Sequence, residues 1–178
     1  MKKLFIAIDI GDNVASYLGS YVEGLPNLGG ARIVPEENYH ITVHFIGYVN
    51  EESLKEIQDR IKQAASRSRP FALRLKGVVL APPGRISTML WAVFEDVEAF
   101  VKLSDDLQQA LSKFGGDTQE KVPHVTLVRS RKSLGGVRRC PDVKKIDQLH
   151  VNQITLMEST EAQGGVYYKP LAHFLLEQ

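Results

Sequence analysis

The chain has 178 residues, of which 43% are hydrophobic and 24% charged, and its formal net charge at pH 7 is +1. This balance is typical of a soluble globular protein, and we expect one domain over residues 1–178. The single cysteine, Cys140, excludes an internal disulfide and a zinc site built from several cysteines. Asp9 ends the first apolar run too early for a signal peptide, and no run could span a membrane, so we expect a cytoplasmic protein without a membrane partner.

The first part of the chain alternates predicted strands and helices. Residues 3–10, "KLFIAIDI", form an apolar run typical of a strand, and residues 11–25 carry apolar side chains at helical spacing. Residues 39–47, "YHITVHFIG", are rich in β-branched and aromatic side chains, which predicts another strand. Residues 50–67 place their apolar side chains on one stripe, which predicts an amphipathic helix.

The later part of the chain begins with the same kinds of element and ends in strands. Residues 71–80 and 87–95 favour strands, and residues 96–116 predict a long helix closed by two glycines. Further strands are predicted over residues 124–130, 149–159 and 166–178. Few long crossovers separate these strands, so we expect mainly antiparallel sheet in an α+β fold of two pseudo-symmetric lobes.

One short motif occurs in both lobes. "HITV" begins at His40 and "HVTL" begins at His124, 84 positions later. Residues i and i+2 of a strand point to the same face, so His40 projects with Thr42 and His124 projects with Thr126. A lone strand histidine is most often structural. Two matching pairs in a chain with five histidines favour a functional site instead.

Two such pairs suit an in-line displacement at phosphorus. The attacking and leaving oxygens of that reaction lie on opposite sides of the phosphorus atom, so a base is needed at one side and an acid at the other. Histidine transfers protons near neutral pH, and two lobes related by an approximate twofold axis would place two histidines across a groove. The threonine hydroxyls would bind the non-bridging phosphate oxygens.

These motifs resemble the paired H-x-T-x signatures of the 2H phosphoesterase superfamily. "KLFIAID", "VPEENYHITVHFIG", "PHVTLVR" and "ITLMES…GGVYYKPLAHFLL" resemble, in order, segments of its RNA 2′,3′-cyclic phosphodiesterase branch, also called 2′-5′ RNA ligases. The resemblance implies a bilobal α+β fold with helices on the outer faces and a central groove. It also implies metal-independent opening of RNA 2′,3′-cyclic phosphate ends to 2′-phosphates, and a reverse capacity to join RNA ends through a 2′-5′ linkage without ATP.

The resemblance also implies roles for individual residues. His40 and His124 carry over as the catalytic pair, with His40 as acid and His124 as base. Thr42, Thr126 and Arg129 carry over as phosphate-binding residues. Arg129 stands five positions after His124, so a regular strand would point it to the opposite face, and we expect a bulge or a strand end to re-aim it. No metal or cofactor is implied, and we expect a monomer.

The flanking residues of the motifs invite weaker interpretations. Phe45 and Gly47 match the family, and we expect them to be structural. His44 shares strand parity with His40 and would border the groove, although packing is favoured. We also favour packing over base stacking for Trp91, whereas Tyr167 and Tyr168 are candidates to stack a base.

Two alternatives to the RNA enzyme stay open. Residues 129–145 hold seven basic residues and one acid, which suits a non-enzymatic RNA-binding module but is also common in solvated loops. The same chemistry could act on a small cyclic-phosphate nucleotide instead of an RNA end. A zinc site on "HITVH" is disfavoured, because its residues favour a strand and no general-base Glu accompanies the histidines.

Overall fold

The computed structural model describes residues 1–25, 28–83, 86–95, 97–116, 121–134, 148–162 and 165–177. Its α-helices are α1 (Gly11–Glu23), α2 (Leu54–Ala65) and α3 (Glu98–Leu111). Its strands are β1 (Lys2–Asp9), β2 (Arg32–Ile33), β3 (His40–Val49), β4 (Phe71–Ala81), β5 (Met89–Glu95), β6 (His124–Arg129), β7 (Leu149–Val151), β8 (Gln153–Ala162) and β9 (Gly165–Leu175). Three short 3₁₀ turns, Glu36–Asn38, Glu51–Ser53 and Ser112–Phe114, join these elements.

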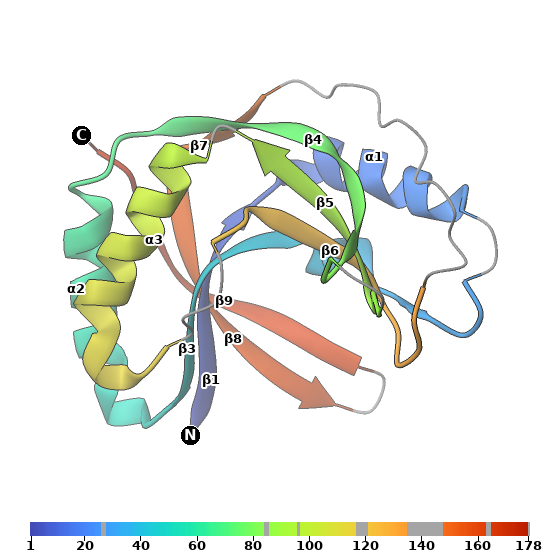
Figure 1. Ribbon diagram of the computed structural model, residues 1–178. Coiled ribbons are helices and arrows are strands. Elements are labelled where there is room, and N and C mark those ends of the chain that lie inside the picture. The colour runs from blue at the N-terminus through green and yellow to red at the C-terminus, as the bar shows by residue number, and fades with distance from the viewer. Residues whose placement is uncertain are drawn as a thin grey trace.

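The strands form one curled antiparallel sheet whose order is symmetric about its centre. The order is β7-β4-β5-β6-β3-β1-β8-β9, and β2 pairs with β6 (Figure 1). The two histidine strands, β3 and β6, meet in the middle, where Ile41 pairs with Val125. Segment β1-α1-β3 on one side of this seam corresponds to β5-α3-β6 on the other. The predicted α+β fold with two pseudo-symmetric antiparallel lobes is confirmed.

Helices α1 and α3 each pack on the lobe opposite to their own. Helix α1 packs against β6, and α3 packs against β3, so each helix covers the histidine strand of the opposite half. Helix α2 lies beside α3 and also packs on β8 and β9 (Figure 1). Among the described residues, no helix combines the length and the apolar character that crossing a membrane requires.

The core lies between the helices and the convex face of the sheet. Ile41 and Val125, the residues that follow the two histidines, are fully buried there, as are Ile61 of α2 and Leu107 of α3. Burying one such aliphatic side chain contributes about 1.5–3 kcal/mol to stability. A one-residue slip of a histidine strand would exchange its two faces and bury His and Thr side chains in this core. The apolar alternation therefore directs both His-x-Thr pairs to the concave face.

Candidate active site

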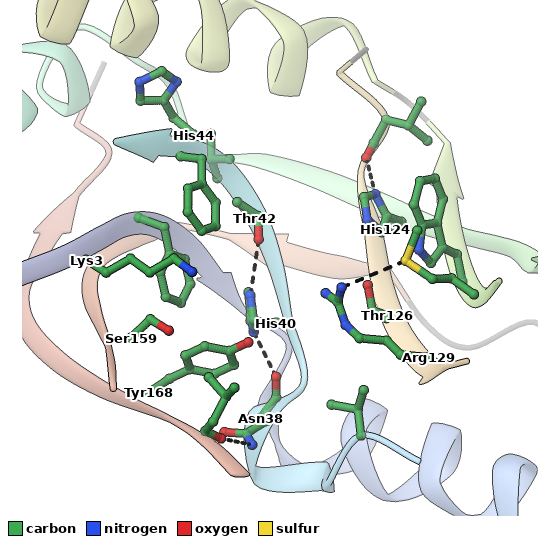
Figure 2. Close-up of a pocket in the computed structure, with 18 of the residues that line it drawn as sticks. Lys3, Asn38, His40, Thr42, His44, His124, Thr126, Arg129, Ser159 and Tyr168 are labelled. Atoms are coloured by element: carbon green, nitrogen blue, oxygen red, sulfur yellow. Dashed lines mark hydrogen bonds between the residues drawn. The ribbon is translucent and has the colours of Figure 1, made fainter. Parts of the chain in front are cut away.

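A cavity of about 490 Å³ occupies the concave face where the two lobes meet. His40 and Thr42 of β3 line it from one side, and His124 and Thr126 of β6 line it from the other. Figure 2 shows both imidazole rings in this cavity, with Arg129 on the His124 side. The structure thus brings together all five residues for which the sequence predicts a role in catalysis or phosphate binding.

The backbone holds both histidine rings in the same way. His40 Nδ1 lies 2.8 Å from the Asn38 carbonyl oxygen, and His124 Nδ1 lies 2.7 Å from the Val122 carbonyl oxygen. A carbonyl oxygen only accepts, so each Nδ1 carries the hydrogen and donates it to the residue two positions earlier. The Nε2 atom of a neutral ring is then left to accept or bind a proton. His40 Nε2 lies 3.1 Å from Thr42 Oγ1, whose hydroxyl donates to it.

Both histidines are half-buried, and their surroundings favour the neutral rings. Burial lowers the pKa of His40 to about 4, the hydrogen bond to the Asn38 carbonyl acts against this, and the positive charges of Arg129 and His124 lower it further. Burial also lowers the pKa of His124. The hydrogen bond to the Val122 carbonyl raises this pKa, and the positive charge of Arg129 lowers it. An anion between the two rings would offset the effect of Arg129 and favour protonation.

A bulge in β6 turns Arg129 toward the cavity. Leu90 of β5 pairs with Val128, and the next residue, Trp91, pairs with Thr126, so Leu127 has no partner on β5. Leu127 and Val128 are consecutive and both fully buried, which reverses the alternation of faces. Arg129 therefore shares the face of His124 and Thr126, as predicted from its spacing.

The histidine strand of the other lobe has a bulge at the same place. Ile6 of β1 pairs with His44, and Ala7 pairs with Thr42, so Val43 has no partner on β1. His44 is consequently buried, and Figure 2 shows it directed away from His40. The bulge breaks the expected shared parity of His44 and His40, but His44 still borders the cavity, and its expected packing role is confirmed. Phe45, expected to be structural, lines the cavity in the position that corresponds to Arg129.

Aromatic side chains cover both catalytic candidates. Trp91 stacks on His124 with ring centroids 3.8 Å apart and an interplanar angle of 19°. Trp91 therefore packs against a side chain of the neighbouring strand, which agrees with the expected packing role, and that side chain is the catalytic candidate His124. The ring of Tyr168 meets His40 edge-on at 4.9 Å, and Phe5 of the neighbouring strand β1 lies 5.0 Å from His40. Tyr167 is 51% exposed and does not line the cavity.

The cavity is positively charged. Among the described residues that line it, the cationic side chains are Lys3, Arg32, Lys121 and Arg129, and the acid is Glu161. Arg32 of β2 pairs directly with Arg129 of β6, so two guanidinium groups come from neighbouring strands at the His124 side. Sequence reasoning missed Arg32, because its two-residue strand has no periodicity. An anionic phosphate is the ligand that this charge distribution favours.

Other candidate sites from the sequence lie elsewhere. His150 is exposed on β7, and His173 Nδ1 lies 2.9 Å from Thr155 Oγ1 on the neighbouring strand, outside the cavity. Over the described ranges, no group of three His, Cys, Asp or Glu side chains is arranged to hold a metal ion. Most of the basic segment predicted to attract RNA, residues 135–145, and Cys140 within it, lie outside the described residues.

Known proteins resemble this chain over most of its length. The family described as LigT like Phosphoesterase matches residues 8–91, which contain His40 and Thr42 but end before His124. The RNA 2′,3′-cyclic phosphodiesterase of Aeropyrum pernix is 30% identical over 152 residues, which cover 79% of this chain and 83% of that protein. The RNA 2′,3′-cyclic phosphodiesterase of Thermotoga maritima is 29% identical over 180 residues, covering 95% of this chain and 92% of that protein.

Solved structures share the fold. Apo LigT of E. coli superimposes with a TM-score of 0.84 at 23% identity, covering 99% of this chain and 98% of that chain. TT0787 of Thermus thermophilus superimposes with a TM-score of 0.80 at 25% identity, covering 98% and 97% of the two chains. The curled sheet with three helices is therefore common to these proteins.

Proposed function

This chain belongs to the LigT-like phosphoesterase family, and on that premise we propose that it opens RNA 2′,3′-cyclic phosphate ends to 2′-phosphates by acid–base catalysis at two histidines. It is an enzyme, a cyclic phosphodiesterase of the kind for which its curated relatives are named. The two-histidine route, its independence of metal and its use in ligation are the parts that we propose.

One observation carries the proposal. Each ring donates its Nδ1 hydrogen to the carbonyl oxygen two residues earlier, and both rings line one cavity from opposite lobes. This leaves two Nε2 atoms, one from each half of the sheet, for a group bound between them. A cyclic phosphodiester needs one proton acceptor and one proton donor on opposite sides of phosphorus, and the pair supplies both.

The reaction follows from this arrangement. His124 takes a proton from water as the water oxygen forms a bond to phosphorus. The bond from phosphorus to the 3′ oxygen breaks, and His40 gives its proton to that oxygen, leaving a 3′-hydroxyl and a 2′-phosphate. Thr42, Thr126 and Arg129 bind the non-bridging oxygens and stabilise the charge that develops there. With the 5′-hydroxyl of a second RNA in place of water, the same displacement joins two RNA ends through a 2′-5′ linkage without ATP.

The test is hydrolysis of a short RNA that ends in a 2′,3′-cyclic phosphate, with the product position assigned by ³¹P NMR. His40→Asn and His124→Asn keep an N–H donor for the backbone carbonyl but remove Nε2. Each proton transfer typically contributes about 10²–10⁴ in rate, so each variant should lose at least about 100-fold in kcat. The control is His150→Asn, at an exposed strand histidine outside the cavity. Full activity in either site variant, or a 3′-phosphate product, would refute the proposal.

A further inference from the structure

Lys3 and two aromatic residues extend the His40 wall of the cavity outward. Lys3 and Phe45 line the cavity, whereas Tyr48 lies beyond its rim and is 62% exposed. Lys3 of β1 pairs with Tyr48 of β3 on one side and with Ser159 of β8 on the other. Figure 2 shows Lys3 and Ser159 on the same side of the cavity as His40. We call Lys3, Phe45 and Tyr48 the outer track.

A second bulge in β3 sets the direction of the outer track. Phe5 pairs with Phe45, but the preceding residue of β1, Leu4, pairs with Gly47, so Ile46 has no partner. Gly47 has a φ of +90°, a conformation that residues with a side chain rarely adopt. After this bulge Tyr48 shares the face of Phe45. The Lys3 Nζ atom accordingly lies 5.9 Å from the centre of the Phe45 ring and 5.7 Å from that of Tyr48.

The charge of Lys3 is available to a ligand. Its neighbour Lys2 points to the opposite face of β1, where its Nζ atom lies 3.0 Å from a carboxylate oxygen of Glu158. In the described part of the chain, no carboxylate forms an ion pair with Lys3, whose Nζ atom lies over the faces of two aromatic rings. A cation between two aromatic faces is a combination that binds single-stranded nucleic acid, because the phosphate meets the cation and the bases stack.

The outer track is continuous with the reaction site. Phe5 lies 5.0 Å from His40 and stacks on Phe45 at 5.7 Å with an interplanar angle of 11°. The other lobe offers no such surface among its described residues that line the cavity. Its aromatic residues there are Trp91, which is already covered by the ring of His124, and Phe100 of α3, which is only 2% exposed. Among the described residues, the exposed aromatic surface that continues the cavity wall therefore lies on the His40 side.

We propose that the outer track binds the RNA strand on the 5′ side of the reacting nucleotide, so that the preferred substrate is an oligonucleotide and not a cyclic mononucleotide. This inference rests on the proposed function. Lys3 binds a backbone phosphate, and Tyr48 stacks a base. Tyr48 stands eight positions after His40, which corresponds to on the order of 20–25 Å in a strand with two bulges. An extended strand advances about 7 Å per nucleotide, twice the advance of a stacked one, so we expect about three to four nucleotides of an extended strand to fill the track.

The experiment compares kcat/KM for a cyclic-phosphate tetranucleotide with kcat/KM for a 2′,3′-cyclic mononucleotide. We expect the ratio of the two to exceed about tenfold and the gain to level off beyond about four nucleotides. Tyr48→Ala should lower this ratio by about 5- to 100-fold, the usual effect of losing one stacked base, and Tyr48→Phe should retain it. The matched control is Tyr167→Ala on β9, another exposed strand tyrosine, but one that is not part of the outer track.

A second arm tests the phosphate contact. Each phosphate contact on a single strand makes the fall of log affinity with log salt steeper by about 0.7. Lys3→Met should therefore make this dependence shallower by about 0.7 for the tetranucleotide. Lys55→Met, on the exposed face of α2, is the control. An equal ratio for wild type and Tyr48→Ala, or a slope unchanged by Lys3→Met, would overturn the outer track. Absence of hydrolysis of both substrates would instead refute the proposed function. In that case, the affinity of Tyr48→Ala for a fluorescent tetranucleotide decides the track.

Discussion

Replacing His40 by Asn should make the folded protein less sensitive to acid. Burial lowers the pKa of His40 from its ordinary 6.5 to about 4, so the folded state resists a proton that the unfolded state accepts. Above pH 6.5 both states hold a neutral ring, and the shift has no effect on stability. As the pH falls from 6.5 to 4, only the unfolded chain gains the proton, and folding weakens by up to about 3 kcal/mol. Below pH 4 both states are protonated and the loss stays constant.

Urea unfolding of wild type and His40→Asn at several pH values measures the loss of stability that His40 causes in acid. Between pH 7 and pH 5 the wild type should lose roughly 2 kcal/mol more than the variant, because the other titrating groups are common to both and cancel. His150→Asn, at an exposed strand histidine outside the cavity, serves as the control for the substitution itself. Parallel curves of free energy against pH for wild type and His40→Asn would show that His40 is not desolvated as the cavity geometry indicates.

The catalytic proposal makes further predictions. A substrate with sulfur in place of its 3′ leaving oxygen needs little protonation, so it should substantially rescue His40→Ala but not His124→Ala; the opposite pattern would exchange the acid and the base. Arg129→Ala removes a cation that lowers the pKa of both histidines, so the bell-shaped profile of kcat/KM against pH should move to higher pH. The same variant should lower kcat about 10²–10³-fold, because Arg129 is proposed to stabilise the transition state. Activity should survive excess EDTA, and its loss with recovery on adding zinc or magnesium would contradict the metal-free route.

Patterns within single helices and strands predicted most of the secondary structure. Every strand and helix expected from residues 3–116 was found, since apolar periodicity records which face of an element is buried. The two His-x-Thr pairs were predictable for the same reason, because strand geometry alone places i and i+2 on one face. The symmetric sheet order depends on long-range pairing, and the repeated element order indicated it before any contact was known.

The bulges explain what sequence reasoning missed. Alternation counted from His40 gave Phe45 no place in the cavity, but the unpaired Val43 reverses the alternation, so that Phe45 lines the cavity and His44, although it also borders the cavity, is buried. The same count of five positions that predicted a bulge before Arg129 applies equally to Phe45, and using it on both lobes would have placed Phe45 in the cavity wall. Trp91 could not be placed in this way, because its stacking on His124 depends on the register of β5 against β6.

The backbone holds His40 and His124 in the same way, so their aromatic neighbours decide which of the two imidazoles holds a proton more readily. The indole face of Trp91 lies flat against His124, and such a face stabilises a cation. His40 meets the edge of Tyr168 and is desolvated, which lowers its pKa to about 4. A single proton in the free site therefore favours His124, whereas the proposed ring opening begins with the proton on His40. The bound phosphate must therefore raise the pKa of His40 far enough for this ring to hold a proton, since a neighbouring negative charge raises a histidine pKa by about 1–3 units. The profile of kcat against pH, which reports the complex, should accordingly lie at higher pH than that of kcat/KM, which reports the free enzyme. Coincident profiles would mean that the phosphate does not sit between the two rings.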